Sequence, residues 1–297
     1  MKASILELAA RRVVLLDGAM GTQLFLKGLS PGDPPELWNA DRPDEIRSVH
    51  AAYFEAGADA VLTNSFGGTP IKLASHGLQD RAEELNRAAA EIAVSVRPPG
   101  RFVGGSMGPT GRFLAPQGEC SESQLDETYA VQARALAEGG VDFLLIETQY
   151  DLREALCALR AARKTGLHVF VTLTFNSFPR GYFTIMGDGI AAGLSALEKA
   201  GASAVGANCT LDSKEMAALV AGMRAATPLP LIAQANSGQP QIEDGGVTYA
   251  QSVEDYVAHV PRMAAAGANI IGGCCGTDPD TIRKMAEILK IPAGGRE

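Results

Sequence analysis

The chain has 297 residues, of which 46% are hydrophobic and 20% charged, values that are ordinary for a globular domain. A formal net charge of −8, with no cluster of Lys or Arg, argues against a nucleic-acid partner, and no apolar run is long enough for a membrane span. The N-terminal segment has an early acid, Glu7, and lacks the apolar core of a secretory signal. Five cysteines are an odd count without the spacing of a disulfide framework. We therefore expect a single-domain cytoplasmic protein with reduced thiols and no nucleic-acid or membrane partner.

Eight short apolar runs alternate with longer amphipathic stretches along the chain. Each run is almost continuously apolar, as expected for strands that are buried on both faces of a parallel sheet. The runs occupy residues 13–16, 60–63, 102–105, 143–146, 169–173, 204–206, 229–233 and 269–271. Their spacing, mostly about 30 to 40 residues, is typical of a repeated strand–helix unit.

The stretches between the runs have apolar residues three and four positions apart, which is the period of an amphipathic helix. Several begin at a capping Ser or Asp, and several end at a glycine such as Gly57 or Gly267. The predicted helices span 44–54, 80–96, 123–138, 151–164, 190–200, 213–225, 252–266 and 278–289. Eight alternating strands and helices predict an α/β protein, a (β/α)8 TIM barrel that forms one domain over residues 1–297. A doubly wound sheet is the alternative, but no Gly-x-Gly-x-x-Gly pattern opens a helix after the first strand.

Three of the cysteines stand at the carboxyl ends of predicted strands, and these ends share one face of a barrel. Cys209 ends the sixth strand, and Cys274 and Cys275 follow the eighth between glycines. A disulfide between neighbours is strained, but adjacent thiolates can ligate one metal. Three thiolates and one vacant position form a zinc site that supports chemistry rather than one that only staples a fold. For Cys120, in a loop, and Cys157, in a helix, we predict no such role.

Polar residues end three further predicted strands on the same face: Asp17 after the first, Glu147 after the fourth and Asn236 after the seventh. The two carboxylates fit the ammonium group of an amino-acid substrate. The backbone amides of the segment that begins at Gly18 and Ala19 fit the carboxylate of the same substrate. Asn236 either shapes the turn that follows it or contributes to the site.

The predicted zinc site favours one type of reaction. Three cysteine thiolates on Zn²⁺ give a complex with a net charge of minus one, and a substrate thiol would bind to it as a thiolate. The bound sulfur then keeps its electron density and remains nucleophilic. Such a site suits alkyl transfer to sulfur, and it suits hydrolysis poorly, because water on so electron-rich a zinc is a weak acid.

Six motifs together resemble the homocysteine S-methyltransferase family, and in particular the homocysteine-binding barrel of cobalamin-dependent methionine synthase. The motifs are Asp17–Thr22, Thr63–Gly67, Gly105–Gly111, Glu147–Thr148, Gly206–Cys209 and Gly272–Thr277. The resemblance covers nearly the whole chain. It implies that the three strand-end cysteines ligate Zn²⁺ and that Asp17 and Glu147 hold the homocysteine ammonium. It also implies that Asn236 lies near the metal, where we expect it to close the vacant position or contact the substrate.

The resemblance also implies methionine formation, in which a zinc-bound homocysteine thiolate attacks a methyl donor. No histidine has an Asp two residues before it, so the Asp-x-His-x-x-Gly pattern of cobalamin binding is missing. We therefore expect methylcobalamin to be supplied by a separate corrinoid protein. One alternative is a single-barrel enzyme that uses S-methylmethionine or betaine. The others are a non-catalytic module that binds homocysteine or another thiol, and a redox protein that uses Cys274 and Cys275 as a dithiol.

Overall fold

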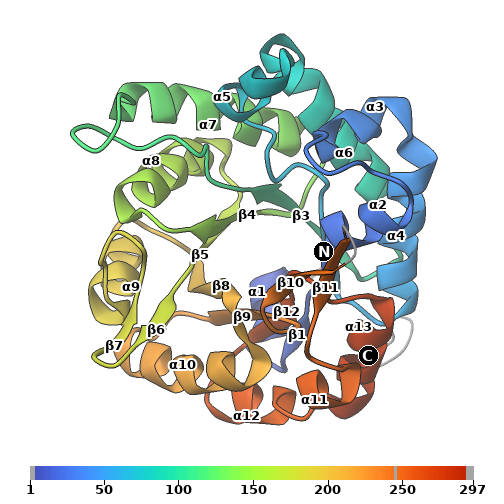
Figure 1. The fold of residues 1–297 in the computed structure, drawn as a ribbon, viewed down its shortest axis with the longest axis vertical. Coiled ribbons are helices and arrows are strands. Elements are labelled where there is room, and N and C mark those ends of the chain that lie inside the picture. The colour runs from blue at the N-terminus through green and yellow to red at the C-terminus, as the bar shows by residue number, and fades with distance from the viewer. Residues whose placement is uncertain (1–3, 244–245, 292–297) are drawn as a thin grey trace.

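Eight parallel strands close into a barrel in the computed structural model, in which residues 4–243 and 246–291 are described. The strands are β1 (Val14–Leu15), β2 (Ala60–Leu62), β3 (Phe102–Met107), β4 (Phe143–Gln149), β5 (His168–Leu173), β8 (Ala204–Asp212), β9 (Leu231–Asn236) and β12 (Ile270–Gly273). They pair in the order β1-β12-β9-β8-β5-β4-β3-β2, and a parallel bridge between Leu16 and Ala60 completes the ring (Figure 1). Each predicted run overlaps one of these strands, so the (β/α)8 barrel is confirmed.

Helices surround the barrel at the predicted places. Seven of them are α4 (Pro43–Glu55), α6 (Ala82–Ser95), α7 (Glu122–Glu138), α8 (Leu152–Ala162), α9 (Ile190–Lys199), α10 (Ser213–Ala226) and α13 (Pro279–Ile288). The prediction of one helix over 252–266 is wrong: the structure has α11 (Val253–Val257) and α12 (Val260–Ala265). Pro261 accounts for the break, because proline has no N–H to donate and its ring clashes with the preceding turn. In the described part of the chain, no helix is both long and apolar enough to cross a bilayer.

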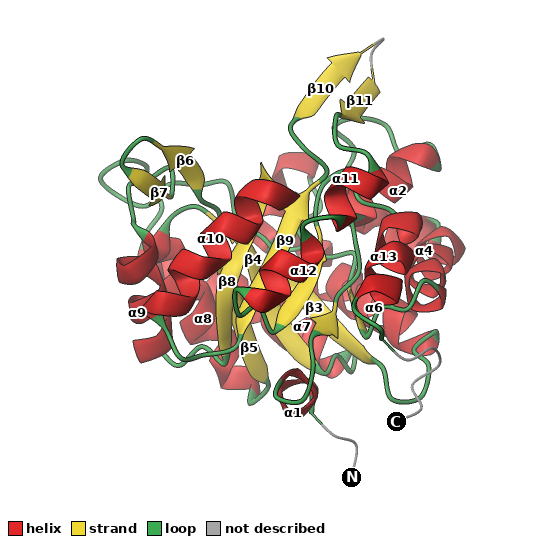
Figure 2. Cartoon of the chain, turned by 90° about the horizontal axis from the view of Figure 1, so that it is seen from below, coloured by secondary structure: helices red, strands yellow, loops and turns green. Residues whose placement is uncertain are grey.

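Short helices that the periodicity did not predict lie before β1, between β1 and β2, and after β2. They are α1 (Ile5–Ala9), α2 (Met20–Leu26), α3 (Trp38–Asp41) and α5 (Pro70–Leu73). Ile5 and Leu8 of α1 join a buried cluster inside the barrel, where the rings of Phe143 and Phe170 stack with centroids 4.8 Å apart. Because side chains fill the barrel interior and α1 covers its amino-terminal end (Figure 2), a substrate must bind at the carboxyl end of the strands.

Two antiparallel hairpins rise from that carboxyl end. One, β6 (Asn176–Phe178) and β7 (Gly181–Phe183), follows β5; the other, β10 (Pro240–Glu243) and β11 (Gly246–Tyr249), follows β9. Figure 2 shows both hairpins projecting from one end of the molecule, with α1 at the other. Neither hairpin was predicted from the sequence.

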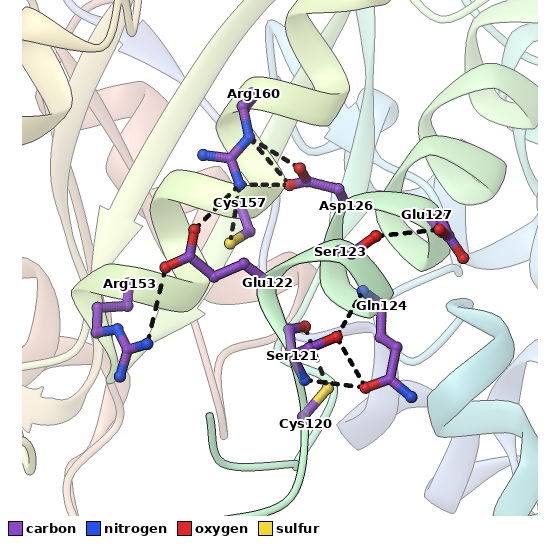
Figure 3. Close-up of polar contacts among 10 residues, drawn as sticks. All are labelled: Cys120, Ser121, Glu122, Ser123, Gln124, Asp126, Glu127, Arg153, Cys157 and Arg160. Atoms are coloured by element: carbon purple, nitrogen blue, oxygen red, sulfur yellow. Dashed lines mark hydrogen bonds and ion pairs between the residues drawn. The ribbon is translucent and has the colours of Figure 1, made fainter. Parts of the chain in front are cut away.

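A polar cluster joins α7 to α8 outside the barrel (Figure 3). Arg160 pairs with Asp126 at 2.8 Å and with Glu122 at 3.6 Å, and it also donates to Cys157 Sγ at 3.4 Å. Burial raises the pKa of the Cys157 thiol to about 11. Cys120 lies nearby, just before α7, and its Sγ contacts the carbonyl of the next residue. Both cysteines therefore belong to the outer helix layer.

A buried carboxylate fixes the amino-terminal end of the barrel where β1 and β2 meet. Asp59, with an exposed fraction of 1%, accepts two bonds from Arg12, at 2.7 and 2.9 Å, and one from the backbone of Leu15 at 3.0 Å. The guanidinium of Arg101, also buried, pairs with the same carboxylate. This ion cluster links β1 to β2, between which the described residues form a single β-bridge, from Leu16 to Ala60. We call this junction the β1–β2 seam.

Asp59→Asn is expected to lower the free energy of unfolding by about 3–5 kcal/mol, because it leaves the buried Arg101 without this countercharge. The matched control is Glu138→Gln, which removes an ion pair to Arg87 whose two side chains are about half exposed. Its cost should stay below about 1 kcal/mol. Urea denaturation measures both, and equal costs would contradict the role given to Asp59.

Candidate active site

Three cysteine sulfurs meet at the carboxyl end of the barrel. The Sγ atoms of Cys209, Cys274 and Cys275 all lie within 4.8 Å of one another, the one such group of potential ligands among the described residues. Zn–S bonds of about 2.3 Å in a tetrahedron place sulfurs roughly 3.8 Å apart. Small side-chain movements would therefore bring all three onto one ion, so the donor set fits a thiophilic metal.

The protonation of these thiols also indicates a cation. Hydrogen bonds from Cys274 and Cys275 lower the pKa of the Cys209 thiol well below its usual value. The pKa of Cys274 is raised in turn, because it donates to Cys209 and is buried. One sulfur thus carries a negative charge easily, and charging all three requires a positive ion between them.

The sequence predicts that Cys209 ends its strand, but β8 continues to Asp212. The register between β8 and β9 shifts after Asn208, and Cys209 and Thr210 have φ angles of 66° and 54°. Left-handed backbone at two non-glycine residues is strained, and such irregularities re-aim side chains. Here the irregularity directs Cys209 toward the other two cysteines.

Glu147 lies at a second irregularity, also inside a strand and not at its end. The register between β4 and β5 shifts between Ile146 and Gln149, and Thr148 has a φ of 59°. The Glu147 side chain is buried and accepts a hydrogen bond from Ser106 Oγ. Burial is the main cause that raises the pKa of this carboxyl to about 7.

Asn208, to which the sequence analysis gave no role, connects the two irregular strands. Its Oδ1 accepts from Thr148 N at 2.7 Å and from Thr172 Oγ1 at 2.8 Å, and its Nδ2 donates to Thr148 Oγ1 at 2.7 Å. The same Nδ2 lies 3.5 Å from Glu147 Oε2 and 3.8 Å from Cys274 Sγ. The fully buried amide thus touches both halves of the site. Its place directly before Cys209, a predicted metal ligand, was the available signal.

Asp17 supplies a second buried carboxyl group. Its Oδ2 accepts from Leu62 N at 2.9 Å, whereas its Oδ1 is buried without a hydrogen-bond partner. Burial raises the pKa of Asp17 well above its usual value, and the charge of Glu147 raises it further. An ammonium group would give the orphaned oxygen a donor and both carboxyl groups a countercharge.

The remaining predicted residues surround this centre. Asn236, the last residue of β9, interacts with the Cys209 side chain and helps to lower the pKa of that thiol, and its own Oδ1 is buried without a partner. Ala19 N donates to the carbonyl of Thr277 at 3.3 Å and to its Oγ1 at 3.2 Å, so this amide is already engaged. Gly18 packs directly against the Thr277 side chain.

One cavity of about 440 Å³ joins these groups. Its inner end contains the three cysteines, Asp17, Gly18, Ala19 and Glu147. Its outer end is lined by Phe25, Asp33, Glu36, Phe66, Lys72 and His76, among others. The predicted site residues therefore share one cavity, with Asn236 behind its wall. The places of Glu36, Lys72 and His76 in the outer part of the cavity were not predicted.

The fold and the cavity define a (β/α)8 barrel in which three cysteine sulfurs and two buried carboxyl groups share one cavity at the carboxyl end of the strands. The model of the homocysteine S-methyltransferase family matches residues 14–289, and the chain belongs to this family. The reaction of the family is methyl transfer to the thiol of homocysteine.

Known proteins resemble the chain over most of its length. Methionine synthase of Mycobacterium leprae (strain TN) is 33% identical over 98% of this chain, and that of Mycobacterium tuberculosis (strain ATCC 25618 / H37Rv) is 32% identical over 95%. The chain spans only about a quarter of these relatives, 26% and 25%. The metallated homocysteine methyltransferase MmuM of Escherichia coli matches with a TM-score of 0.77 and 27% identity, over 93% of this chain and 96% of that one.

Gly18→Ala is expected to destabilise the protein by about 1–3 kcal/mol through overpacking. A Cβ at Gly18 would lie 2.7 Å from Thr277 Oγ1 and 3.0 Å from the Tyr53 hydroxyl. Gly21→Ala is the control, because a Cβ there meets nothing within 4 Å and helix α2 favours alanine. Thermal and urea unfolding compare the two variants, and equal stabilities would contradict the close packing at Gly18.

Proposed function

We propose that this chain forms methionine by zinc-dependent methyl transfer to the thiol of homocysteine. The observation that carries the proposal is one cavity in which three converging thiols face two buried carboxyl groups. An all-sulfur donor set favours zinc over hard cations. Since the thiols must stay reduced, we expect the reaction to take place in the cytoplasm.

The described contacts suggest how homocysteine lies in the cavity. We place its ammonium between Asp17 and Glu147, where it pairs with the free Asp17 Oδ1. We assign its carboxylate to the backbone of the segment that begins at Gly18 and Ala19, in which the Ala19 amide already donates to Thr277. Its thiol then points toward the cysteines, with Asn236 beside the metal.

Each group has a defined part in the reaction. Zinc, when bound by Cys209, Cys274 and Cys275, would hold the homocysteine sulfur as a thiolate and keep it nucleophilic. The two carboxylates orient the substrate so that this sulfur faces the donor. A carbon–sulfur bond forms as the bond between methyl and donor breaks, and the electron pair of the broken bond stays with the donor.

For the donor, we propose methylcobalamin on a separate corrinoid protein. Phe25, Leu26, Phe66 and Phe113 lie on segments that follow the first three barrel strands, and their exposed fractions run from 40% to 79%. Phe25 and Phe66 also line the cavity, and exposed apolar side chains at a cavity favour a docking surface for another protein. Such a surface is what a protein-borne donor needs.

A second candidate is a complete enzyme with a small donor, S-methylmethionine or betaine. The cavity extends outward from the homocysteine position to Glu36, Lys72 and His76, so it has room and charge for a second small molecule. The near end-to-end match with a homocysteine methyltransferase favours this candidate as well.

Methionine formation with the donors offered separately distinguishes these candidates. We expect zinc-dependent turnover with methylcobalamin and none with S-methylmethionine or betaine. Cys275→Ala should remain folded by circular dichroism but lose the metal and the activity, because the site lies at the mouth and not in the core. Cys120→Ala, outside the cavity, is the matched control and should keep both.

Other outcomes point to the alternatives. Rapid turnover with a sulfonium or ammonium donor and no corrinoid would identify the complete enzyme. Homocysteine binding without turnover from any donor would identify a non-catalytic module. Protein that contains no metal when purified under reducing conditions would favour the dithiol redox protein.

The KM for homocysteine is expected to rise as the pH falls below about 7. Glu147, whose raised pKa is about 7, loses the charge that pairs with the substrate ammonium as it becomes protonated. Full coupling gives up to about tenfold per pH unit. In Glu147→Gln the KM should be higher at pH 8 and nearly constant between pH 8 and 6. Metal content measured at each pH controls for loss of zinc, and a flat wild-type profile would refute the assignment.

A further inference from the structure

Tyr249, the last residue of β11, extends from the second hairpin to the cysteine cluster. Its half-buried side chain lines the cavity together with Cys275, and its hydroxyl interacts with the thiol of that residue. A phenol hydroxyl donates to a thiolate, which can only accept. Nothing in the sequence pattern pointed to this residue, because it lies outside the eight strand–helix units.

The backbone next to the cysteine pair is shaped to receive the tyrosine ring. Gly276 follows Cys275 and has a φ of +81°, a conformation that favours glycine. A Cβ on Gly276 would lie only 2.3 Å from Cγ of the Tyr249 ring. The ring therefore packs directly on the turn that presents Cys275.

The base of the hairpin is tied to both parts of the cysteine cluster. Ser237 N donates to the Cys275 carbonyl at 2.9 Å, and Gln251 N donates to the Ser237 carbonyl at 3.0 Å. Across the mouth, the Gln239 side chain donates to the carbonyl of Thr210, the neighbour of Cys209. These bonds fix the point from which Tyr249 reaches inward.

Tyr249 also completes a pattern around the three sulfurs. The Asn236 side chain interacts with that of Cys209, and Asn208 Nδ2 lies 3.8 Å from Cys274 Sγ. With Tyr249 beside Cys275, each of the three sulfurs has a polar side chain of another residue next to it. Such partners orient metal ligands and tune their basicity.

We propose that Tyr249 is a positioning residue of the metal centre, whose hydroxyl donates to Cys275 Sγ, holds this sulfur toward the ion and moderates its electron donation. The inference rests on the proposed function, because it requires a metal at the cysteine cluster. Loss of one such partner typically weakens metal binding about 10- to 100-fold.

Tyr249→Phe tests the proposal, because it removes the hydroxyl and keeps the ring on Gly276. In substrate-free protein we expect about tenfold weaker zinc binding, measured by competition with a chromogenic chelator. With one Co²⁺ bound per chain, the thiolate-to-cobalt charge-transfer band should move to lower energy, since the sulfur lone pair loses its donor. Tyr182→Phe, on β7 of the other hairpin, is the control and should leave both unchanged.

A second variant separates the hydroxyl from the ring. Tyr249→Leu removes both and should weaken zinc binding at least as much as Tyr249→Phe. If the Phe variant matches the wild type in affinity and spectrum, and only the Leu variant loses metal, the ring merely packs and the proposal is overturned. A wild-type chain that binds no zinc would overturn the proposed function as well. A wild type that binds zinc and makes methionine, with an unchanged Phe variant, would overturn the Tyr249 assignment alone.

Discussion

The side chain of Asn208 is the contact on which the geometry of the site depends. β4 and β8 are separated in the sheet by β5, yet Asn208 joins them through two bonds of 2.7 Å to Thr148, and a third bond of 2.8 Å ties it to Thr172 of β5. Left-handed backbone at Thr148 and Cys209 costs about 1–3 kcal/mol per residue and persists only where the surroundings impose it. A buried amide whose oxygen and nitrogen are both engaged supplies that constraint. The strained backbone has a role in the site, because it turns Glu147 and Cys209 into the same cavity.

The inner end of the cavity concentrates groups of one sign. Asp17 and Glu147 are buried, and their raised pKa values show that each is poorly solvated in its charged form. The thiols likewise share negative charge with difficulty. Two positive charges would resolve this, one at the sulfurs and one between the carboxylates. In the proposed function these charges are a metal dication and the homocysteine ammonium, and binding of each would make the other end less repulsive.

The fold was predictable from the sequence because every barrel strand is buried on both faces and leaves a continuous apolar run. The cavity was largely predictable because parallel strands share one carboxyl end, which places Asp17, Cys274 and Cys275 together. The positions of Cys209 and Glu147 inside their strands were not, since the positive φ angles fall on non-glycine residues and are imposed by distant contacts. The hairpins leave no apolar run, because they project beyond the core. For the same reason Tyr249 had no signal.

Stability and chemistry are located at opposite ends of this barrel. At the amino-terminal end, α1 fills the interior and the Asp59 ion cluster crosses the β1–β2 seam, so that end is packed and paired. At the carboxyl end, buried oxygens of Asp17 and Asn236 remain without partners. Unsatisfied buried polar atoms are costly, and a domain tolerates them where a ligand completes them. The packing and ion pairs at the amino-terminal end thus offset the cost of the unpaired groups at the carboxyl end, which an ammonium and a metal would use.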